Sequence, residues 1–187
     1  MLEGQGYFKN ITLSTSYIKT NPGFAGYFSE TNMFNGNGQL RIFKNLFITG
    51  NYIQDAKNYQ HDTLILSAPY RKYIQMGLRY QYLQTGYIAL YNGFQKYDDR
   101  MEQKKFNYEE KFARIDISQK IGAINVNIES YWGKTNNILN AFSGNSSYYT
   151  ANLGFDKFNT SINIYGSYFM TSRYQSANQK CCIMAEI

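Results

Sequence analysis

The stretch AINVNIESYW, residues 123–132, alternates apolar and polar side chains with a period of two. Successive side chains of a β-strand point to opposite faces of a sheet, so this alternation predicts a strand. One face then carries Ile124, Val126, Ile128 and Trp132. A soluble sheet would bury these side chains in a protein core. A membrane barrel would instead turn them toward lipid and keep the asparagines in a wet interior.

Polar connections of two lengths join such segments, and short and long connections alternate strictly along the chain. Short turns begin at residues 43, 83, 119 and 155, with the sequences FKNL, LQTG, QKIG and FDKF. Longer polar connections begin at Asp55, Gln95 and Gly133. A meander with short turns at one end and long loops at the other is typical of an outer-membrane barrel. The spacing also suits a solenoid or propeller, but no motif recurs at fixed offsets.

The apolar faces have aliphatic centres and aromatic ends, which favours lipid over a protein core. On the segment 72–82, Ile74, Met76 and Leu78 are followed by Tyr80 and Tyr82 on the same face. Amphipathic rings prefer the headgroup level of a bilayer. The expected strands of about 10 to 13 residues also suit the about 9 to 11 residues of a tilted membrane strand, rather than the about 5 to 6 usual in globular sheets.

The composition supports strands and excludes a helical membrane protein. The 187 residues include 19 Tyr, 13 Phe and only 2 Pro, and the mean hydropathy is -0.50. No stretch approaches the about 18 consecutive apolar residues of a membrane helix. The opening residues MLEGQGYFKN lack the basic start and apolar core of a signal peptide. Export is therefore either not needed or directed by a segment outside this sequence.

The alternation predicts about nine long strands in an all-β, antiparallel, up-and-down meander. They are expected near residues 7–19, 26–43, 46–55, 72–82, 86–95, 111–119, 123–132, 147–155 and 158–170. Single-chain bacterial barrels close with an even number of strands. The end of the chain, CCIMAEI, also lacks alternation and a terminal aromatic residue. We therefore expect a barrel domain over residues 1–174, a tail without the barrel pattern over 175–187, and a chain that is a segment of a larger barrel or truncated.

From about Tyr7 to Tyr174, the chain resembles a Gram-negative outer-membrane β-barrel protein with the Tyr- and Asn-rich texture common in the Bacteroidetes. The resemblance is one of pattern, and no motif identifies a particular family. It implies a location in the cell outer membrane, with the lipid bilayer as partner. Further barrel strands or other outer-membrane proteins are the other partners that it suggests.

The face opposite the apolar one is polar and supplies the candidate site. The residues expected to line a lumen are Arg41, Arg79, Arg114, Asp116, Asn127 and Glu129. Charged groups on this face can line an aqueous path and select solutes. They can equally pair with each other to fill a narrow barrel. The segment GYIALYNGF, residues 86–94, departs from the pattern because it is apolar on both faces.

Other chemistry has weaker support in the sequence. His61 stands beside Asp62, but neither a nucleophile nor a second acid accompanies them. Asp98, Asp99 and Glu102 could offer oxygen ligands to calcium, but their spacing is not that of an EF-hand and basic residues surround them. The glycines of FNGNGQL lack the following Lys-Ser/Thr of a phosphate loop. We expect no catalytic residues, no cofactor and no metal.

Three functions remain open from the sequence. The first is an outer-membrane barrel that passes solutes through a polar lumen and carries long extracellular loops. The second is a barrel without conductance that serves as an anchor, in adhesion or in the assembly of a complex. The third is a soluble, secreted, β-rich protein that binds glycans through its tyrosines. The net charge of +6 is spread among residues of both signs, so nucleic acid is not an expected partner.

Overall fold

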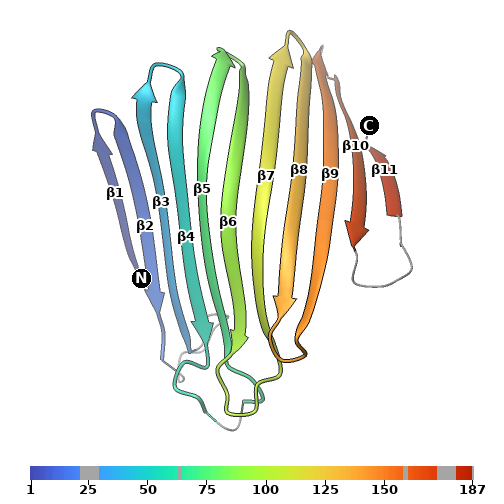
Figure 1. The fold of residues 1–187 in the computed structure, drawn as a ribbon. Helices are drawn as coiled ribbons and strands as arrows, with labels where there is room; N and C mark the ends of the chain where they lie inside the picture. Colours follow the sequence, from blue (N-terminus) through green and yellow to red (C-terminus); the bar gives the residue numbers. More distant parts are fainter. Residues whose placement is uncertain (22–29, 63–64, 158–159, 172–179, 187) are drawn as a thin grey trace.

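One antiparallel sheet of eleven strands in sequential order makes up the structure (Figure 1). This computed structural model describes residues 1–21, 30–62, 65–157, 160–171 and 180–186. The strands are β1 (Leu2–Phe8), β2 (Ile11–Lys19), β3 (Thr31–Phe43), β4 (Leu46–Lys57), β5 (Pro69–Leu83), β6 (Gly86–Asp99), β7 (Asn107–Ile121), β8 (Ile124–Asn137), β9 (Phe142–Lys157), β10 (Thr160–Thr171) and β11 (Lys180–Glu186). The predicted all-β meander is confirmed. No helix that is long and apolar enough to cross a membrane occurs in the described ranges.

Tight turns join the strands at one end of the sheet, and long connections join them at the other (Figure 1). Only two residues separate β3 from β4, β5 from β6, and β7 from β8. Antiparallel neighbours can be linked this tightly, whereas parallel strands need a crossover. In the turn between β7 and β8, Gly122 has a φ of 60°, a conformation that costs glycine little. The predicted alternation is confirmed for the longer connections after Asp55 and Gln95. The long connection predicted from Gly133 is wrong, because β8 and β9 extend into it and leave only residues 138–141 between them.

The strand count differs from the nine predicted. The segment 7–19, expected as one strand, is the end of β1, a turn at Lys9 and Asn10, and β2. Lys180–Glu186 form β11 and pair with β10, so the expectation that the tail has no strand is wrong for these residues. Backbone pairing needs only free N–H and C=O groups, so an edge strand can form without alternation. The predicted start of a strand at residue 26 falls within residues 22–29, which lie outside the described residues.

The strands also run further than predicted at the end with the long connections. Strands β3 to β10 have 12 to 16 residues, and β9 begins at Phe142 where the sequence suggested 147. The predicted bounds followed the apolar positions only. Cross-strand pairing continues past these positions, because polar residues form the backbone hydrogen bonds between strands equally well.

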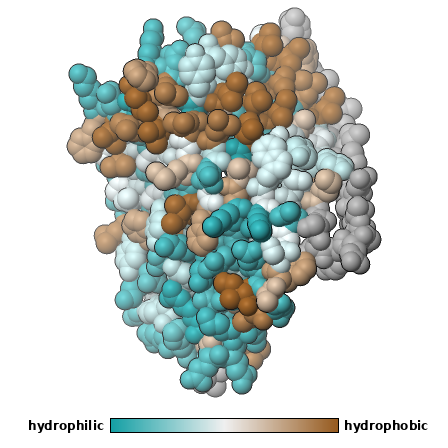
Figure 2. Space-filling model, in the orientation of Figure 1, coloured by the Kyte–Doolittle hydropathy of each residue, from teal (hydrophilic) through white to brown (hydrophobic). Residues whose placement is uncertain are grey.

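The apolar side chains share one face and remain exposed there. Pairing places Ile48, Leu78 and Leu90 in one row across β4, β5 and β6, and Ile115 of β7 continues it. The exposed fraction is 48% for Leu78 and 52% for Leu90. Figure 2 shows the resulting hydrophobic band across the strands near the short turns, with hydrophilic surface toward the long connections. A continuous uncovered apolar surface of this kind marks contact with a membrane or a partner.

The buried apolar core is small, and part of it lies at the end with the long connections. Ala68 and Tyr70 are buried there, next to the fully buried Asp99. The Asp99 carboxylate accepts hydrogen bonds from the backbone N–H groups of Ala68 at 2.9 Å, Met101 at 3.2 Å and Lys105 at 3.2 Å. Asp99 therefore ties the β4–β5 connection to the β6–β7 connection.

Both carboxylates at the end of β6 have partners within the protein. Asp98 pairs with Lys104 at 3.0 Å, and Asp99 accepts hydrogen bonds from three backbone N–H groups. In the described ranges, no cluster of three His, Cys, Asp or Glu residues could hold a metal. Burial by itself would raise the pKa of Asp99, but the three N–H donors outweigh it and hold the pKa below its ordinary value.

We predict that Asp99→Asn exposes the β6–β7 connection to trypsin at Lys104 and Lys105. An amide has only one acceptor oxygen, so buried N–H groups lose their partner at a cost of about 1–3 kcal/mol. The control is Glu102→Gln in the same connection, which removes the charge of an exposed side chain and should change the free energy of unfolding by no more than about 0.5 kcal/mol. Because the folded pKa is lowered, the stabilisation is present above the ordinary carboxyl pKa of 3.8 and is lost as the pH falls below it. Equal cleavage of both variants would contradict this role for Asp99.

Candidate functional site

Four of the six candidate residues lie in a single cross-strand row on the face opposite the apolar band. Paired positions lead from Arg41 on β3 through Phe47 to Arg79 on β5, and from there through Ala89 to Asp116 on β7 and Glu129 on β8. The basic members lie on β3 and β5, and the acidic members lie on β7 and β8. The row is therefore charge-separated, with the apolar Phe47 and Ala89 between its members.

Arg114 joins the acidic end of the row. Its guanidinium lies 3.0 Å from the Asp116 carboxylate and 3.9 Å from the Glu129 carboxylate. Glu129 also accepts a hydrogen bond of 2.6 Å from the Tyr148 hydroxyl. These contacts fix the orientation of three predicted site residues. Asn127 lies in the next row, where its side-chain oxygen accepts a hydrogen bond of 2.7 Å from Ser118.

Aromatic rings lie against the arginines of the polar face, a role that the sequence pattern did not predict for them. The guanidinium carbon of Arg79 lies 3.9 Å from the ring centre of Tyr87, and that of Arg114 lies 4.6 Å from Tyr91. Arg41 lies 5.3 Å from the ring centre of Phe47. Each contact falls within the range of a cation–π interaction. This explains why β6 is apolar on both faces: its tyrosines support arginines on the polar face.

A stack of rings continues across the same face toward the long connections. Ring centres are 5.6 Å apart for Tyr73 and Phe112, 5.3 Å for Phe112 and Tyr131, and 4.7 Å for Tyr131 and Tyr148, with interplanar angles of 22°, 21° and 10°. The Tyr131 hydroxyl donates a hydrogen bond of 2.8 Å to Glu110. Offset stacking of this kind adds about 0.5–1.5 kcal/mol per pair beyond burial.

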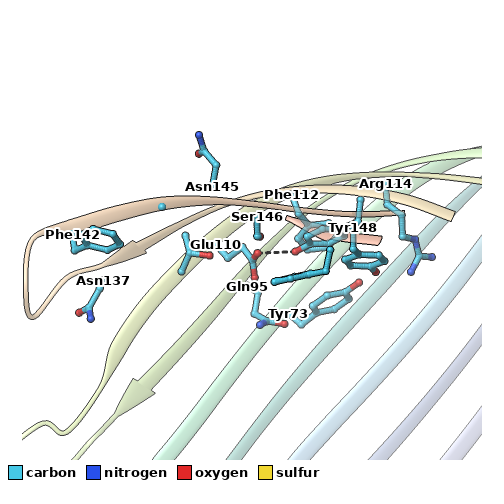
Figure 3. A pocket seen from close by; sticks show the side chains of 14 residues that line it. Tyr73, Gln95, Glu110, Phe112, Arg114, Asn137, Phe142, Asn145, Ser146 and Tyr148 are labelled. Carbon is cyan, nitrogen blue, oxygen red and sulfur yellow. Dashed lines mark hydrogen bonds between the residues drawn. The ribbon is translucent and has the colours of Figure 1, made fainter. Parts of the chain in front are cut away.

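The stack forms one wall of a pocket of about 490 Å³. Figure 3 shows the rings of Tyr73, Phe112 and Tyr148 gathered beside Arg114, with Glu110 nearby. A second pocket of about 350 Å³ lies closer to the charged row and is lined by Thr49, Asn51 and Arg114, among others. In the described residues, the oxygens Thr49 Oγ1, Asn51 Oδ1 and Asp116 Oδ1 have no hydrogen-bond partner. These acceptors are buried, so each carries the cost of a hydrogen bond that is not made.

His61, the alternative catalytic candidate, is far from this face in the fold. It lies exposed in the β4–β5 connection, with a φ of 60°. The polar face carries ion pairs, amides and phenols, which can order water and bind polar solutes. The signal that could have revealed the stack is the recurrence of Tyr73, Tyr131 and Tyr148 in phase with the polar residues of their strands.

Comparison with known proteins places this geometry on an outer-membrane barrel fold. The structure is similar to OmpTdeltaL8, a loop L8 deletion mutant of OmpT, an outer membrane protein of Vibrio cholerae, with a TM-score of 0.70 and 11% identity over 98% of this chain and 60% of that chain. Outer-membrane expressed OmpT of Vibrio cholerae gives a TM-score of 0.65 and 10% identity over 89% of this chain and 52% of that chain. No protein-family model and no curated protein sequence matches the chain.

The chain thus spans little more than half the length of these two neighbours, and the similarity concerns the fold alone. The predicted fold class, an antiparallel meander of the outer-membrane barrel kind, is confirmed. In the described part of the chain the sheet is open: its order runs from β1 to β11, and these two strands form its edges.

Glycines on β6 make room for the aromatic stack, and this gives a test of its packing. A Cβ atom on Gly93 would clash with the Phe112 ring and would lie 2.8 Å from the backbone oxygen of Ile74. A Cβ atom on Gly50, on the apolar face, would meet nothing within 4 Å. Gly93 therefore has no room for even the smallest side chain.

We predict that Gly93→Ala displaces Phe112 and lowers the free energy of unfolding by about 1–3 kcal/mol, the usual cost of overpacking. Gly50→Ala should leave stability unchanged within about 0.5 kcal/mol. The measurement is the temperature at which each variant loses heat-modifiable migration on gels, with near-ultraviolet circular dichroism reporting the ring stack. Gly93→Ala behaving like Gly50→Ala would show that the stack is not closely packed.

Proposed function

We propose that this protein is an outer-membrane β-barrel protein whose polar face lines a path for hydrophilic solutes. The observation that carries the proposal is the charge-separated row from Arg41 to Glu129, which lies directly behind an uncovered apolar band. A sheet with one face for lipid and one for water suits the wall of an aqueous pore. We also propose a non-enzymatic role, because the polar groups form ion pairs and ring contacts rather than a nucleophile–base pair.

The dimensions of the band support insertion in a bilayer. On β8, the apolar face runs from Ile124 to Trp132, eight residue steps or about 27 Å along the strand. The usual tilt of about 35–45° reduces this to about 20 Å, near the apolar height of about 25 Å in known barrels. At the end with the long connections, Trp132 donates a hydrogen bond of 3.0 Å to the Tyr149 hydroxyl, and Tyr149 lies 6.2 Å from Tyr168. This aromatic group suits the headgroup level.

The open sheet supports further barrel strands or another outer-membrane protein as partners. Unpaired backbone groups cost several kcal/mol each in hydrocarbon, so the edges β1 and β11 need pairing in a membrane. Strands of the same protein or of a partner could supply it. The long connections then face the cell exterior, as is usual for such barrels.

Anchoring or complex assembly without conductance is the second candidate. The Asp99 contacts favour it, because they hold two long connections together as a fixed surface. A glycan-binding soluble protein has less support, since the apolar band would face water. A need for detergent to keep the protein in solution would separate the soluble glycan-binding protein from the two membrane barrels. Single-channel conductance would then separate the pore from the anchor.

We predict that Ile128→Arg and Ile164→Arg block membrane assembly, whereas Asn127→Arg is tolerated. An arginine on the lipid face at mid-membrane costs about 2–4 kcal/mol, and a position on the polar face already meets water. Ile128 and Ile164 are 40% and 44% exposed on the apolar face. Assembly is measured by heat-modifiable migration and carbonate-resistant membrane association. If all three variants assemble equally, the assignment of the two faces is wrong.

We predict that Arg41→Glu with Arg79→Glu shifts ion selectivity toward cations in planar bilayers. Two positive charges become negative at one end of the row, so anions lose their favourable site. The control is Lys44→Glu in the β3–β4 turn, outside the row, which should leave selectivity unchanged. A wild-type protein that inserts and resists protease but carries no current would favour the anchor over the pore.

A further inference from the structure

Four lysines lie on the outward, apolar-band face of four consecutive strands, just beyond the band. Lys72 on β5 pairs with Lys96 on β6, and Lys111 on β7 pairs with Lys134 on β8. Phe94, two residues from Lys96, pairs with Lys111, so the two lysine pairs adjoin. All four are in phase with apolar residues of their strands, including Ile74, Ala113 and Trp132.

This arrangement does not serve the stability of the sheet. Like charges directly opposite each other on neighbouring strands are destabilising. One acidic residue forms an ion pair with this group of lysines: a carboxylate oxygen of Glu109 lies 3.4 Å from the Lys96 Nζ atom. In the described part of the chain, no ion pair is formed by Lys72, Lys111 or Lys134. The patch therefore keeps a local excess of positive charge on a surface beside the apolar band.

An apolar hollow begins directly beside Lys111 and Lys134. It measures about 760 Å³ and is lined by Ala113, Trp132 and Met170 together with these lysines. One outward row of paired positions across β6 to β10 holds Asn92, Ala113, Trp132, Ser147 and Met170 in this order. The small side chains of Ala113 and Ser147 leave the surface hollowed on both sides of Trp132.

The hollow continues into the centre of the band. A second hollow of about 500 Å³ shares Asn92, Ala113 and Trp132 with the first, and it extends to Leu78, Leu90 and Ile115. Together they form a track from two lysines at the border of the band to its aliphatic middle. A track of this shape suits a molecule with an anionic head and an apolar tail.

We propose that this track binds a phosphorylated, acylated glycolipid of the outer leaflet, with its phosphate on Lys111 and Lys134 and an acyl chain along the hollow. The proposal rests on the membrane insertion proposed above and adds a specific lipid site to it. Charge complementarity selects the occupant, because lysines bind phosphate as point charges and the apolar hollow favours a chain over a free ion. Lys72 and Lys96 extend the positive surface toward a second phosphate. The lysines lie on the same side of the band as the long connections, so the lipid belongs to the outer leaflet.

Trp132, the only tryptophan of the chain, lines both hollows and provides the readout. The experiment titrates the full chain, with its edges β1 and β11 paired as in the outer membrane, in neutral detergent micelles with bisphosphorylated lipid A and follows the fluorescence of Trp132. We expect a saturable change for the wild type and at least tenfold weaker binding for Lys111→Gln with Lys134→Gln. Fully dephosphorylated lipid A should bind at least tenfold more weakly than the bisphosphorylated form.

The matched control is Lys9→Gln with Lys44→Gln, which removes two exposed lysines from turns at the opposite end of the strands and should bind like the wild type. Equal binding by the Lys111/Lys134 variant, equal binding of dephosphorylated lipid A, or the same signal from inorganic phosphate alone would each overturn the proposal. Heat-modifiable migration is recorded for every sample. Intact migration without lipid binding refutes the lipid site alone, whereas loss of migration in the wild type refutes membrane assembly and the site together.

Discussion

Backbone hydrogen bonding between neighbouring strands is the interaction on which the rest of this structure depends. Each strand from β2 to β10 pairs along its length with the strands before and after it. Few of the described side chains are buried, so in this part of the chain an apolar core of the usual kind does not hold the sheet together. In hydrocarbon, an unpaired N–H or C=O group costs several kcal/mol. A continuous ladder is therefore both the framework of this fold and the condition for placing it in lipid.

The register of that ladder decides what each face can do. Side chains alternate with a period of two, so a slip of one residue in one strand would carry its apolar residues to the polar face. The register that places Arg79, Asp116 and Glu129 on one face also places Leu78, Leu90 and Ile115 on the other. The apolar face and the polar face are thus two results of one set of pairings. The tight turns help to set the register, because two-residue connections leave little freedom to slip.

The sequence predicted the strands and turns that follow from the alternation of side chains. It missed the features that depend on which strands pair and in which register. Alternation in the segment 123–132 correctly placed β8, and the short turns at 43, 83 and 119 correctly placed three hairpins. The turn at Lys9 and Asn10 was missed because alternation runs through it. Strand β11 was missed because its pairing with β10 does not require alternation. All six candidate residues were placed on the polar face by period, but the common row of Arg41, Arg79, Asp116 and Glu129 required the register of several strands.

The role of Tyr87 and Tyr91 shows why an apparent exception to the pattern carries information. A strand that is apolar on both faces interrupts the polar face, and this strand separates the basic part of the row from the acidic part. Ala89 carries no charge and cannot neutralise either part, and it is fully buried between them. The tyrosine rings hold Arg79 and Arg114 by their faces, an interaction that orients a guanidinium without cancelling its charge. Arg79 therefore keeps its charge for the aqueous side, which direct pairing with Asp116 would have removed. An apolar strand in the middle of a polar face thus preserves the separation between the basic and the acidic part of the row.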